Sequence, residues 1–599
     1  MIVKISTKKK LKNLIILFFI AFVLLIVRVF YLQFAEGEKL SNMAYEQQTS
    51  DRKINPNRGK IYDATMKNVL AKSYTVQSIT VNPTSIKEKE KVARELSDLF
   101  NLDYDNTLKK IKKRTSIQKV VNKVDNEKAT ELRKWMAENN INEGINIDED
   151  TKRVYPFNNL ASQIIGFCGG DNQGLTGIEK EYDENLKGKQ GTISKITDAS
   201  GKRIAGTAEE YNNPTDGDDI VLTIDLNIQS IAEKYLKQAC IDNNCIDGGN
   251  VIVMNPQNGE VLGIAGYPNF NLNDPFFNEE SLPQGLAEKN GLDANNLSDS
   301  DKNKLAQSLW RNKAISDPYE PGSTFKIVTT SIALETGIAT PDKAGQYCCV
   351  GYIEVAGVKM KCWRYYRPHG SESLREALEN SCNPIFIGLG EKIGVSTYYQ
   401  FLDKFGFFRK TGIDIPGEAS SIFLNEKKVG PVELATISFG QRFKITPIQM
   451  ATMLSSIGNK GVYVKPHLVK KIISNSEFDE NGNRKVTEIG KTEGERIISE
   501  ENAKNVLSMM QSVVDVGTGK KAKYEGINIG GKTGTSEDGV NTGKYIASFI
   551  GIAPVEAPKV VVLVTLYNPK GEGGHSGGGI AAPVAGKIIK ECVEYLNEE

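Results

Sequence analysis

Glu320-Pro321-Gly322-Ser323-Thr324-Phe325-Lys326 is the stretch from which the fold and chemistry of this chain can be predicted. Its proline and glycine bend the chain, and the apolar run behind it, Ile327–Leu334, predicts a helix that Ser323 opens. The Ser323 hydroxyl would lie near the positive end of the helix dipole, which stabilises developing negative charge. Lys326 follows three residues later on the same helical face, within reach of Ser323. Because a desolvated lysine can take a proton from serine, this pair predicts a nucleophilic serine.

Two more short motifs follow along the chain. Ser381-Cys382-Asn383 stands behind a predicted helix, Leu374–Glu379, and Lys532-Thr533-Gly534-Thr535 stands behind a predicted strand, Ile527–Gly530. Glycines in and before the Lys532 motif would let a substrate backbone approach closely. A serine and a lysine at the first spacing recur elsewhere in the chain, so that motif alone is weak evidence. All three motifs in this order form the signature of penicillin-binding proteins and class A β-lactamases.

The chain resembles the class B penicillin-binding proteins, the monofunctional transpeptidases of division, elongation and sporulation. The resemblance runs from the N-terminal apolar segment almost to the C-terminus. It rests also on Arg58-Gly59-x-Ile61-x-Asp63, Arg153-x-Tyr155-Pro156, Gly174-Leu175-Thr176-Gly177-Ile178-Glu179, Ser438-Phe439-Gly440-Gln441 and Thr446-Pro447-Ile448-Gln449. It implies a peptidoglycan D,D-transpeptidase, which is a serine-type acyltransferase that cross-links stem peptides and is acylated by β-lactams.

The resemblance also implies catalytic roles for five residues. Ser323 would attack the carbonyl between the two terminal D-alanines of a stem peptide, and Lys326 would be its general base. Ser381 would relay the proton to the leaving amine, Asn383 would hold the substrate amide, and Lys532 would supply positive potential. An amine from a second stem peptide would then resolve the acyl-enzyme, and no cofactor is implied for this catalysis.

The family's substrate-binding residues map onto the rest of the Lys532 motif. The hydroxyls of Thr533 and Thr535, on either side of Gly534, would bind the substrate carboxylate. The backbone N–H groups of Ser323 and Thr535 would form the oxyanion hole.

Other functions stay open on sequence alone. On the same fold, a carboxypeptidase or β-lactamase would let water resolve the ester, but the long N-terminal region and the apolar segment argue against both. A membrane-bound penicillin sensor or division scaffold is the alternative from another class, and the intact motifs disfavour a purely binding role. The sequence does not distinguish septal, side-wall and spore-cortex synthesis.

The N-terminus has the pattern of a membrane anchor. Residues 14–34 are almost uninterruptedly apolar and long enough to cross the hydrocarbon core of a bilayer. Lysines stand before them at positions 4, 8, 9, 10 and 12, so the positive-inside rule places residues 1–13 in the cytoplasm. A cleaved signal peptide is the alternative, but the segment ends in no small-x-small site. We expect a single-pass protein of the cytoplasmic membrane with an extracytoplasmic catalytic domain.

The rest of the chain predicts two domains of an α+β protein. Residues 35–220 mix short β-rich runs with a charged helical stretch, Lys87–Asn140, and resemble the family's elongated pedestal (dimerisation-type) domain. Residues 221–599 start with a helix capped by Asp225 and a β-hairpin, and they end with two strands and a helix. This order predicts an antiparallel sheet with packed helices, which fits the serine transpeptidase (penicillin-binding/β-lactamase-like) domain.

One cluster stands outside this chemistry. Cys349, Cys362 and His369 are thiol and imidazole groups close in sequence, and these are the ligand types of structural zinc. A fourth ligand would come from Cys348 or from a distant aspartate. The aspartate is the better candidate, because adjacent cysteines rarely both bind one tetrahedral ion. A Cys349–Cys362 disulfide and unpaired thiols are the alternatives. Cys382 is expected to pack in the core.

Composition excludes one class of partner. The 599-residue chain has 75 basic and 74 acidic side chains, so it has no bulk attraction for nucleic acid. Only three histidines occur, which argues against a multi-histidine catalytic metal site and leaves few candidates for a Ser-His-Asp triad. The expected partners are peptidoglycan stem peptides, β-lactams, the membrane and, as in the family, a polytopic glycan polymerase with division or sporulation proteins.

Overall fold

The computed structural model describes residues 5–37, 39, 49–115, 117–196, 210–276, 286–490, 494–539 and 542–598. Lys4 of the predicted cytoplasmic tail lies outside these residues. The chain divides into two compact units. Unit 1 comprises Met1–Asn57, Tyr74–Lys152 and Gly188–Thr215, and unit 2 comprises Arg58–Ser73, Arg153–Lys187 and Asp216–Glu599.

Helix α1, Ile5–Phe34, contains the predicted anchor segment. Within the described part of the chain it is the one helix long and apolar enough to cross a membrane, and none of its apolar window is buried. An apolar helix of this length without a protein partner needs a nonpolar solvent around it. The helix therefore fits a single-pass membrane protein.

The globular part of unit 1 combines antiparallel strands with three helices. Strand β3, Val69–Val81, pairs with β4, Gln118–Val124, and with β5, Ile145–Val154. A second sheet joins β1, Thr49–Ile54, β6, Gly191–Ile196, and β7, Glu210–Asn212. The helices are α3 (Lys89–Phe100), α4 (Tyr104–Ile111) and α5 (Asn126–Glu138).

The predicted helical stretch Lys87–Asn140 is wrong at its centre. The chain leaves helical geometry after α4 and forms β4 before α5 begins. Val120, Val121 and Val124 of β4 are buried in the same apolar cluster as the helices. Branched side chains pack well on a sheet and lose χ1 freedom in a helix, which accounts for the strand.

Unit 2 is built on a five-stranded antiparallel sheet with the strand order β10-β9-β19-β18-β17. The predicted hairpin is confirmed as β9, Gly249–Met254, and β10, Val261–Tyr267. The predicted C-terminal strands are β18, Tyr545–Ala553, and β19, Val560–Tyr567. Strand β17, Gly530–Glu537, pairs with β18 only and is an edge strand of this sheet.

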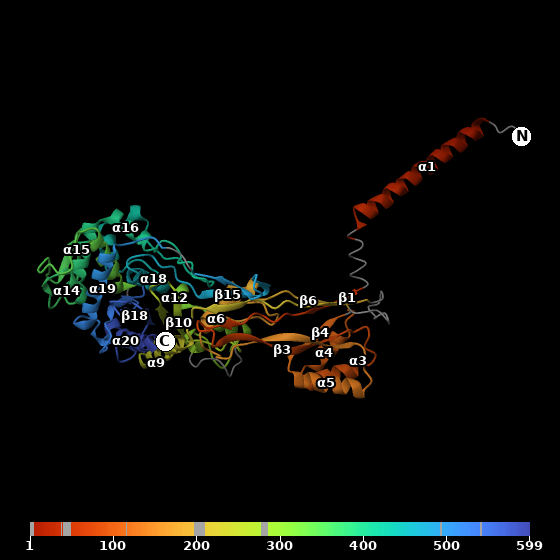
Figure 1. Ribbon diagram of the computed structural model, residues 1–599, viewed down its shortest axis with the longest axis horizontal. Coiled ribbons are helices and arrows are strands. Elements are labelled where there is room, and N and C mark those ends of the chain that lie inside the picture. The colour runs from red at the N-terminus through yellow and green to blue at the C-terminus, as the bar shows by residue number, and fades with distance from the viewer. Residues whose placement is uncertain are drawn as a thin grey trace. The chain divides into compact units, whose positions relative to one another are not determined.

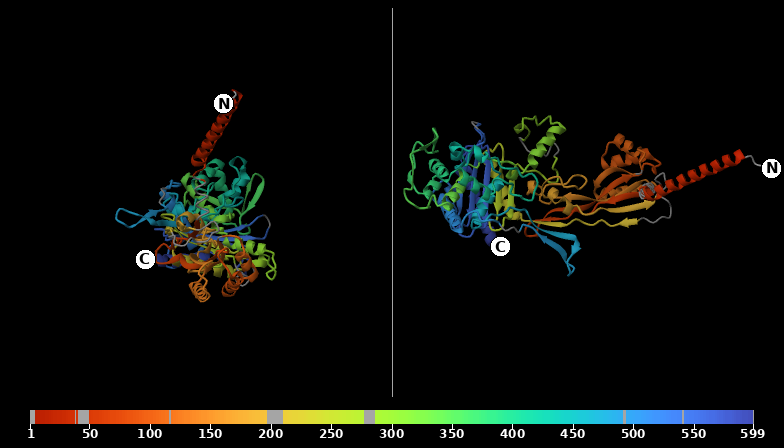
Figure 2. Two further views of the ribbon diagram at one scale, coloured as in Figure 1. Left: turned by 90° about the vertical axis from the view of Figure 1, so that its right-hand side faces the viewer. Right: turned by 90° about the horizontal axis from the view of Figure 1, so that it is seen from above.

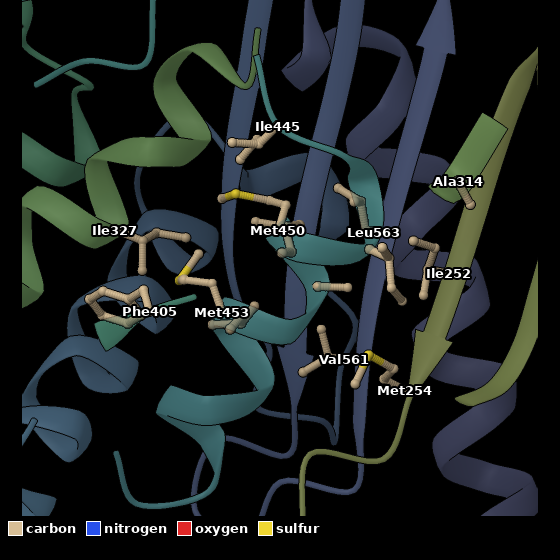
Figure 3. Close-up of a cluster of buried hydrophobic side chains, with 14 of the residues drawn as sticks. Ile252, Met254, Ala314, Ile327, Phe405, Ile445, Met450, Met453, Val561 and Leu563 are labelled. Carbon is tan, nitrogen blue, oxygen red and sulfur yellow. The ribbon is translucent and has the colours of Figure 1, made fainter. Parts of the chain in front are cut away.

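Helices cover both faces of this sheet (Figure 2). Val251 and Val253 of β9 pack in the same cluster as α9, Leu226–Asp242, and the C-terminal helix α20, Ala582–Glu598. Their neighbours on β9 point the opposite way, as the strand period requires, and meet α18, Pro447–Gly458. Figure 3 shows Met450 and Met453 of α18 beside the residues Ile252, Val561 and Leu563 of the sheet. The α+β class with an antiparallel sheet and packed helices is confirmed.

The remaining strands and helices of unit 2 lie around this core, and many are labelled in Figure 1. β2 (Ile61–Tyr62), β8 (Asp219–Leu222), β15 (Val469–Phe478) and β16 (Arg484–Glu488) pair in that order. The helices are α6 (Ser162–Ile165), α7 (Gly177–Glu181), α8 (Asp183–Leu186), α10 (Leu286–Lys289), α11 (Asp299–Trp310), α12 (Lys313–Ser316), α13 (Lys326–Glu335), α14 (Leu374–Glu379), α15 (Asn383–Ile393), α16 (Val395–Lys404), α17 (Pro431–Ile437) and α19 (Glu500–Asp515). Between α13 and α14 in the sequence, the chain forms two short ladders. These are β11 (Tyr347–Cys349) with β14 (Gly370–Glu372) and β12 (Tyr352–Val355) with β13 (Val358–Lys361).

Candidate active site

Ser323 lies in a tight turn against the edge strand β17. It belongs to the 3₁₀ turn η2, Gly322–Phe325, and the α-helix itself begins only at Lys326, one turn later than predicted. The turn packs very closely. Gly322 has a φ of +55°, and a Cβ on Gly440 would lie 2.0 Å from the carbonyl oxygen of Gly322. A Cβ on Gly534 of β17 would lie 2.8 Å from the carbonyl oxygen of Pro321. Glycine is therefore required where the serine turn meets its neighbours.

Lys326 is completely buried and is held by the second motif. Its Nζ donates to the Ser381 carbonyl oxygen at 2.7 Å, to Ser381 Oγ at 3.1 Å and to Asn383 Oδ1 at 2.7 Å. Burial lowers the pKa of Lys326 to about 7, because the charged ammonium loses its hydration, and the nearby Cys382, Cys362 and Glu372 offset this loss only in part. The three donated hydrogen bonds use all three protons of the ammonium form, and with this pKa the neutral amine, which has two N–H groups and a lone pair, is also present near neutral pH.

Lys532 contacts the same hydroxyl. The Lys532 motif lies within β17, so the prediction that it follows a strand is wrong: the strand begins at Gly530 and includes all four motif residues. Lys532 Nζ donates to Ser381 Oγ at 3.1 Å and to the Thr533 carbonyl oxygen at 3.1 Å. Burial, and then the nearby charge of Lys326, hold the pKa of Lys532 well below its usual value.

The Ser381 hydroxyl thus accepts hydrogen bonds from both lysines. Because a hydroxyl has two acceptor lone pairs and one proton, its O–H is left to donate to a third group. Ser381 has a left-handed backbone with a φ of +53°, which is strained for a residue with a Cβ. Backbone hydrogen bonds from Ser381 N to Leu378 O and from Cys382 N to Ala377 O hold this turn between α14 and α15.

These motifs line one cleft of about 660 Å³. Its lining residues come from all three motifs and from later loops: Gly322, Ser323, Trp363, Ser381, Asn383, Phe439, Gln441, Thr518, Lys521, Thr533, Gly534, Thr535, His575, Ser576, Gly578 and Gly579. The structure therefore brings together the motif residues that the sequence singled out, and the two lysine side chains lie beneath them.

The two threonines of the third motif are held by loops. Thr533 Oγ1 donates to Thr518 Oγ1 at 3.2 Å, and Thr535 Oγ1 accepts from Gly577 N at 3.0 Å. Trp363, Thr518 and His575 were not predicted as site residues. They come from segments without a recognisable motif, and only folding places them at the cleft.

The Cys/His cluster lies directly beside this site. One potential ligand atom from each of Cys349, Cys362, His369 and Cys382 lies within 4.8 Å of all the others. The fourth member of this group is Cys382, whereas the sequence predicted Cys348 or an aspartate. Cys348 is exposed, and within the described residues neither it nor an aspartate joins this group. Cys382 is buried, as expected, between the motif residues Ser381 and Asn383.

The cluster combines free thiols with a buried imidazole nitrogen that has no hydrogen-bond partner. Cys349, Cys362 and Cys382 are free thiols, so the alternative disulfide is not formed in this structure. A hydrogen bond from the Cys382 thiol lowers the pKa of Cys362 below its ordinary value, and His369 adds to the effect. The His369 Nε2 atom is buried without a hydrogen-bond partner, and Nδ1 lies 3.7 Å from the sulfur of Cys362.

The site combines a serine in a tight turn, two buried lysines and a second serine whose hydroxyl accepts hydrogen bonds from both lysines. In an α+β domain this combination defines a serine acyl-transferase of the penicillin-recognising type. The penicillin binding protein transpeptidase domain matches residues 249–590, and the penicillin-binding protein dimerisation domain matches residues 53–222. The chain belongs to the penicillin-binding protein family, as its motifs indicated.

Individual relatives agree with this assignment. Stage V sporulation protein D of Bacillus subtilis is 35% identical over 99% of this chain and 86% of its own length. Peptidoglycan D,D-transpeptidase FtsI of Escherichia coli is 26% identical over 97% of this chain and 90% of its own. The fold is shared with a peptidoglycan synthetase of Bifidobacterium adolescentis, with a TM-score of 0.69, 24% identity and coverage of 92% and 97% of the two chains.

Proposed function

We propose that this chain is a peptidoglycan D,D-transpeptidase that cross-links stem peptides through an acyl-enzyme on Ser323, and that penicillins acylate the same serine. The observation that carries the proposal is the shared hydrogen bonding of Lys326 and Lys532 to Ser381, beneath the cleft that Ser323 lines. Relatives named as transpeptidases and as a sporulation protein support the activity and a role in septal or spore cell-wall synthesis.

Acylation begins with proton removal from Ser323. The neutral amine of Lys326 takes the hydroxyl proton as Ser323 Oγ bonds to the carbonyl carbon of the penultimate D-alanine. The peptide C–N bond then breaks, and Ser381 passes its free proton to the leaving D-alanine amine while Lys326 returns one to Ser381. The acceptor amine of a second stem peptide attacks the ester, and the same groups carry protons in reverse order.

Substrate binding uses the edge strand. Because β17 pairs on one side only, an extended stem peptide can add to its other edge through backbone hydrogen bonds. Asn383 holds the substrate amide, and Lys532 with the hydroxyls of Thr533 and Thr535 binds the terminal carboxylate. Gly534 lets the backbone come close, and the N–H groups of Ser323 and Thr535 stabilise the oxyanion.

Turnover of stem peptides tests this proposal. Full-length protein in detergent should join a pentapeptide donor to an acceptor amine and release D-alanine. The rate of acylation should rise about tenfold per pH unit below pH 7 and level off above it, because only the neutral form of Lys326, with a pKa of about 7, accepts the proton. Stopped-flow acylation across pH 5 to 9 measures the profile.

Two outcomes would contradict this scheme. Covalent penicillin binding without any stem-peptide turnover would identify a penicillin sensor, and no binding at all would leave a scaffold. An acylation rate independent of pH between 5 and 8 would remove Lys326 as the base.

We also propose the membrane arrangement of the chain. Residues 1–13 lie in the cytoplasm, residues 14–34 cross the membrane, residues 35–220 form the pedestal and residues 221–599 the extracytoplasmic transpeptidase domain. The lysines that precede the apolar run starting at Leu14 support this orientation, and the proposed substrate lies outside the cell. A polytopic glycan polymerase and division or sporulation proteins are the partners that the family suggests.

An alkaline phosphatase fusion after residue 45 should be active, because that enzyme requires export. A fusion after residue 10 should be inactive and is the control. Edman sequencing of the mature protein should find the original N-terminus. A chain starting near residue 35 would replace the anchor by a cleaved signal peptide.

We propose in addition that Cys349, Cys362, His369 and Cys382 hold a structural zinc ion. Sulfurs bound to one tetrahedral zinc lie about 3.8 Å apart, and the cluster's 4.8 Å limit needs little adjustment to reach this. The lowered pKa of Cys362 supplies a thiolate, and His369 has a buried nitrogen without a partner. The ion would act only as a structural cross-link between β11, the loop after β13 and the start of α15.

A further inference from the structure

The β12–β13 hairpin between the first two motifs has two very different faces. Tyr352 pairs with Lys361 and Ile353 with Met360 across this antiparallel ladder. Ile353, Val355 and Met360 point inward and pack with Phe439 in an apolar cluster between α15 and α17. The inward face therefore fixes the hairpin (residues 352–361, near α14 and α15 in Figure 1) to the transpeptidase core.

The outward face of the hairpin and the loop behind it are mostly aromatic and basic, with one acid on the hairpin's outward face, Glu354, opposite Lys359 on the ladder. Tyr352, Trp363, Tyr365 and Tyr366 expose 44%, 51%, 55% and 73% of their surface. Lys359 Nζ lies 3.7 Å from the ring centroid of Tyr352, and Lys361 Nζ lies 4.9 Å from that of Tyr365. We call these six residues the aromatic–basic surface. Large exposed aromatic groups gathered in one place are unusual on a soluble domain and indicate a binding surface.

This surface is continuous with the catalytic cleft. Trp363 lines the cleft together with Ser381 and Asn383. Its Nε1 donates to the carbonyl oxygen of Asn380 at 3.0 Å, one residue before Ser381. A polymer whose reacting group occupies the cleft can therefore extend over Trp363 onto the other aromatic rings.

We propose that the aromatic–basic surface binds the glycan strand that carries the reacting stem peptide. Pyranose rings present apolar C–H faces, which stack on exposed aromatic rings, and tyrosine and tryptophan also offer a polar edge for hydroxyl groups. The two lysines beside the rings complement the carboxylates of stem peptides. The inference rests on the proposed transpeptidase function and adds that the enzyme recognises sugar as well as peptide.

The charge pattern favours this occupant over a protein partner. The surface pairs each of two rings with an ammonium group, which suits an acidic, hydroxyl-rich polymer. A protein partner bound permanently to this surface would also cover Trp363, which lines the cleft, and would obstruct the substrate.

The test compares a glycan-linked and a glycan-free substrate. The triple variant Tyr352→Ser, Tyr365→Ser and Tyr366→Ser, as full-length protein in detergent, should lose binding to purified uncross-linked glycan strands by roughly tenfold to a hundredfold. Its rate of acylation by a small fluorescent penicillin and its KM for a free pentapeptide should stay within about twofold. Phe478→Ser, which removes a similarly exposed ring on β15, is the matched control and should bind strands like the wild type.

Unchanged strand binding by the triple variant would overturn the inference, as would an equal loss of affinity for the free pentapeptide. Zinc content is measured in every variant, because Tyr365 and Tyr366 lie between Cys362 and His369 in the sequence. A second variant, Tyr352→Ser alone, lies outside that loop and should already weaken strand binding. If the wild type takes up no penicillin, the proposed function fails, whereas the glycan surface is judged by strand binding alone.

Discussion

Replacing Ser323 by alanine should abolish covalent labelling by a fluorescent penicillin and all transpeptidation while leaving the fold intact. The Ser323 hydroxyl is the only group of the scheme that forms a covalent bond to the substrate. The rate of transpeptidation should therefore fall by about 10⁴-fold to 10⁶-fold. Alanine keeps the Cβ that Ser323 already has and removes only the hydroxyl, so it fits at this position. Labelling is read on a gel, and folding is read from the thermal unfolding curve.

The matched control is Ser331→Ala in the following helix. Ser331 is buried, and its hydroxyl donates only to the Ile327 carbonyl oxygen within α13. This variant should label normally, because it removes a serine of the same helix without touching the cleft. Mass spectrometry that finds a penicillin adduct on any residue other than Ser323 would reject the assignment of the nucleophile.

The motif residues of the candidate site could be identified from the sequence because each motif is short and local. Ser323 and Lys326 belong to one turn, and Lys532, Thr533 and Thr535 belong to one strand, so their relative positions depend on local geometry. The position of Ser381 could not be predicted in detail. Its hydroxyl accepts one hydrogen bond from a lysine of α13 and one from a lysine of β17, and these two elements lie about two hundred residues apart in the sequence.

The errors have the same physical origin. The strand β4 was missed because three valines within a charged, helix-rich stretch bury themselves against α3 and α5, and tertiary packing outweighs local propensity. The cleft residues Trp363 and His575 come from loops, where no periodicity exists to read. Cys382 was expected to be a core residue, and it is buried, but its sulfur faces three ligand atoms that the chain supplies from a separate segment.

Zinc provides the second large expected effect. Protein purified without metal-affinity resin should contain about one zinc ion per chain, held by Cys349, Cys362, His369 and Cys382. Chelation should lower the temperature of thermal unfolding by several degrees, because metal binding that occurs only in the folded state contributes directly to stability. Zinc should also be lost more readily in acid, since thiolates and imidazole must be deprotonated to bind. Elemental analysis and melting with and without chelator measure both effects.

The sharpest variant is Cys382→Ala, because Cys382 separates Ser381 from Asn383. Removing this one ligand should release zinc and slow acylation on the order of tenfold, although every group of the catalytic scheme remains in the chain. The left-handed backbone of Ser381 is strained, so a tether at the next residue should help to hold it beneath the cleft. Cys348→Ser is the control, since Cys348 is exposed and adjacent to Cys349 but stands outside the cluster. Substoichiometric zinc with an unchanged melting temperature would leave plain thiols or a disulfide as the chemistry of this cluster.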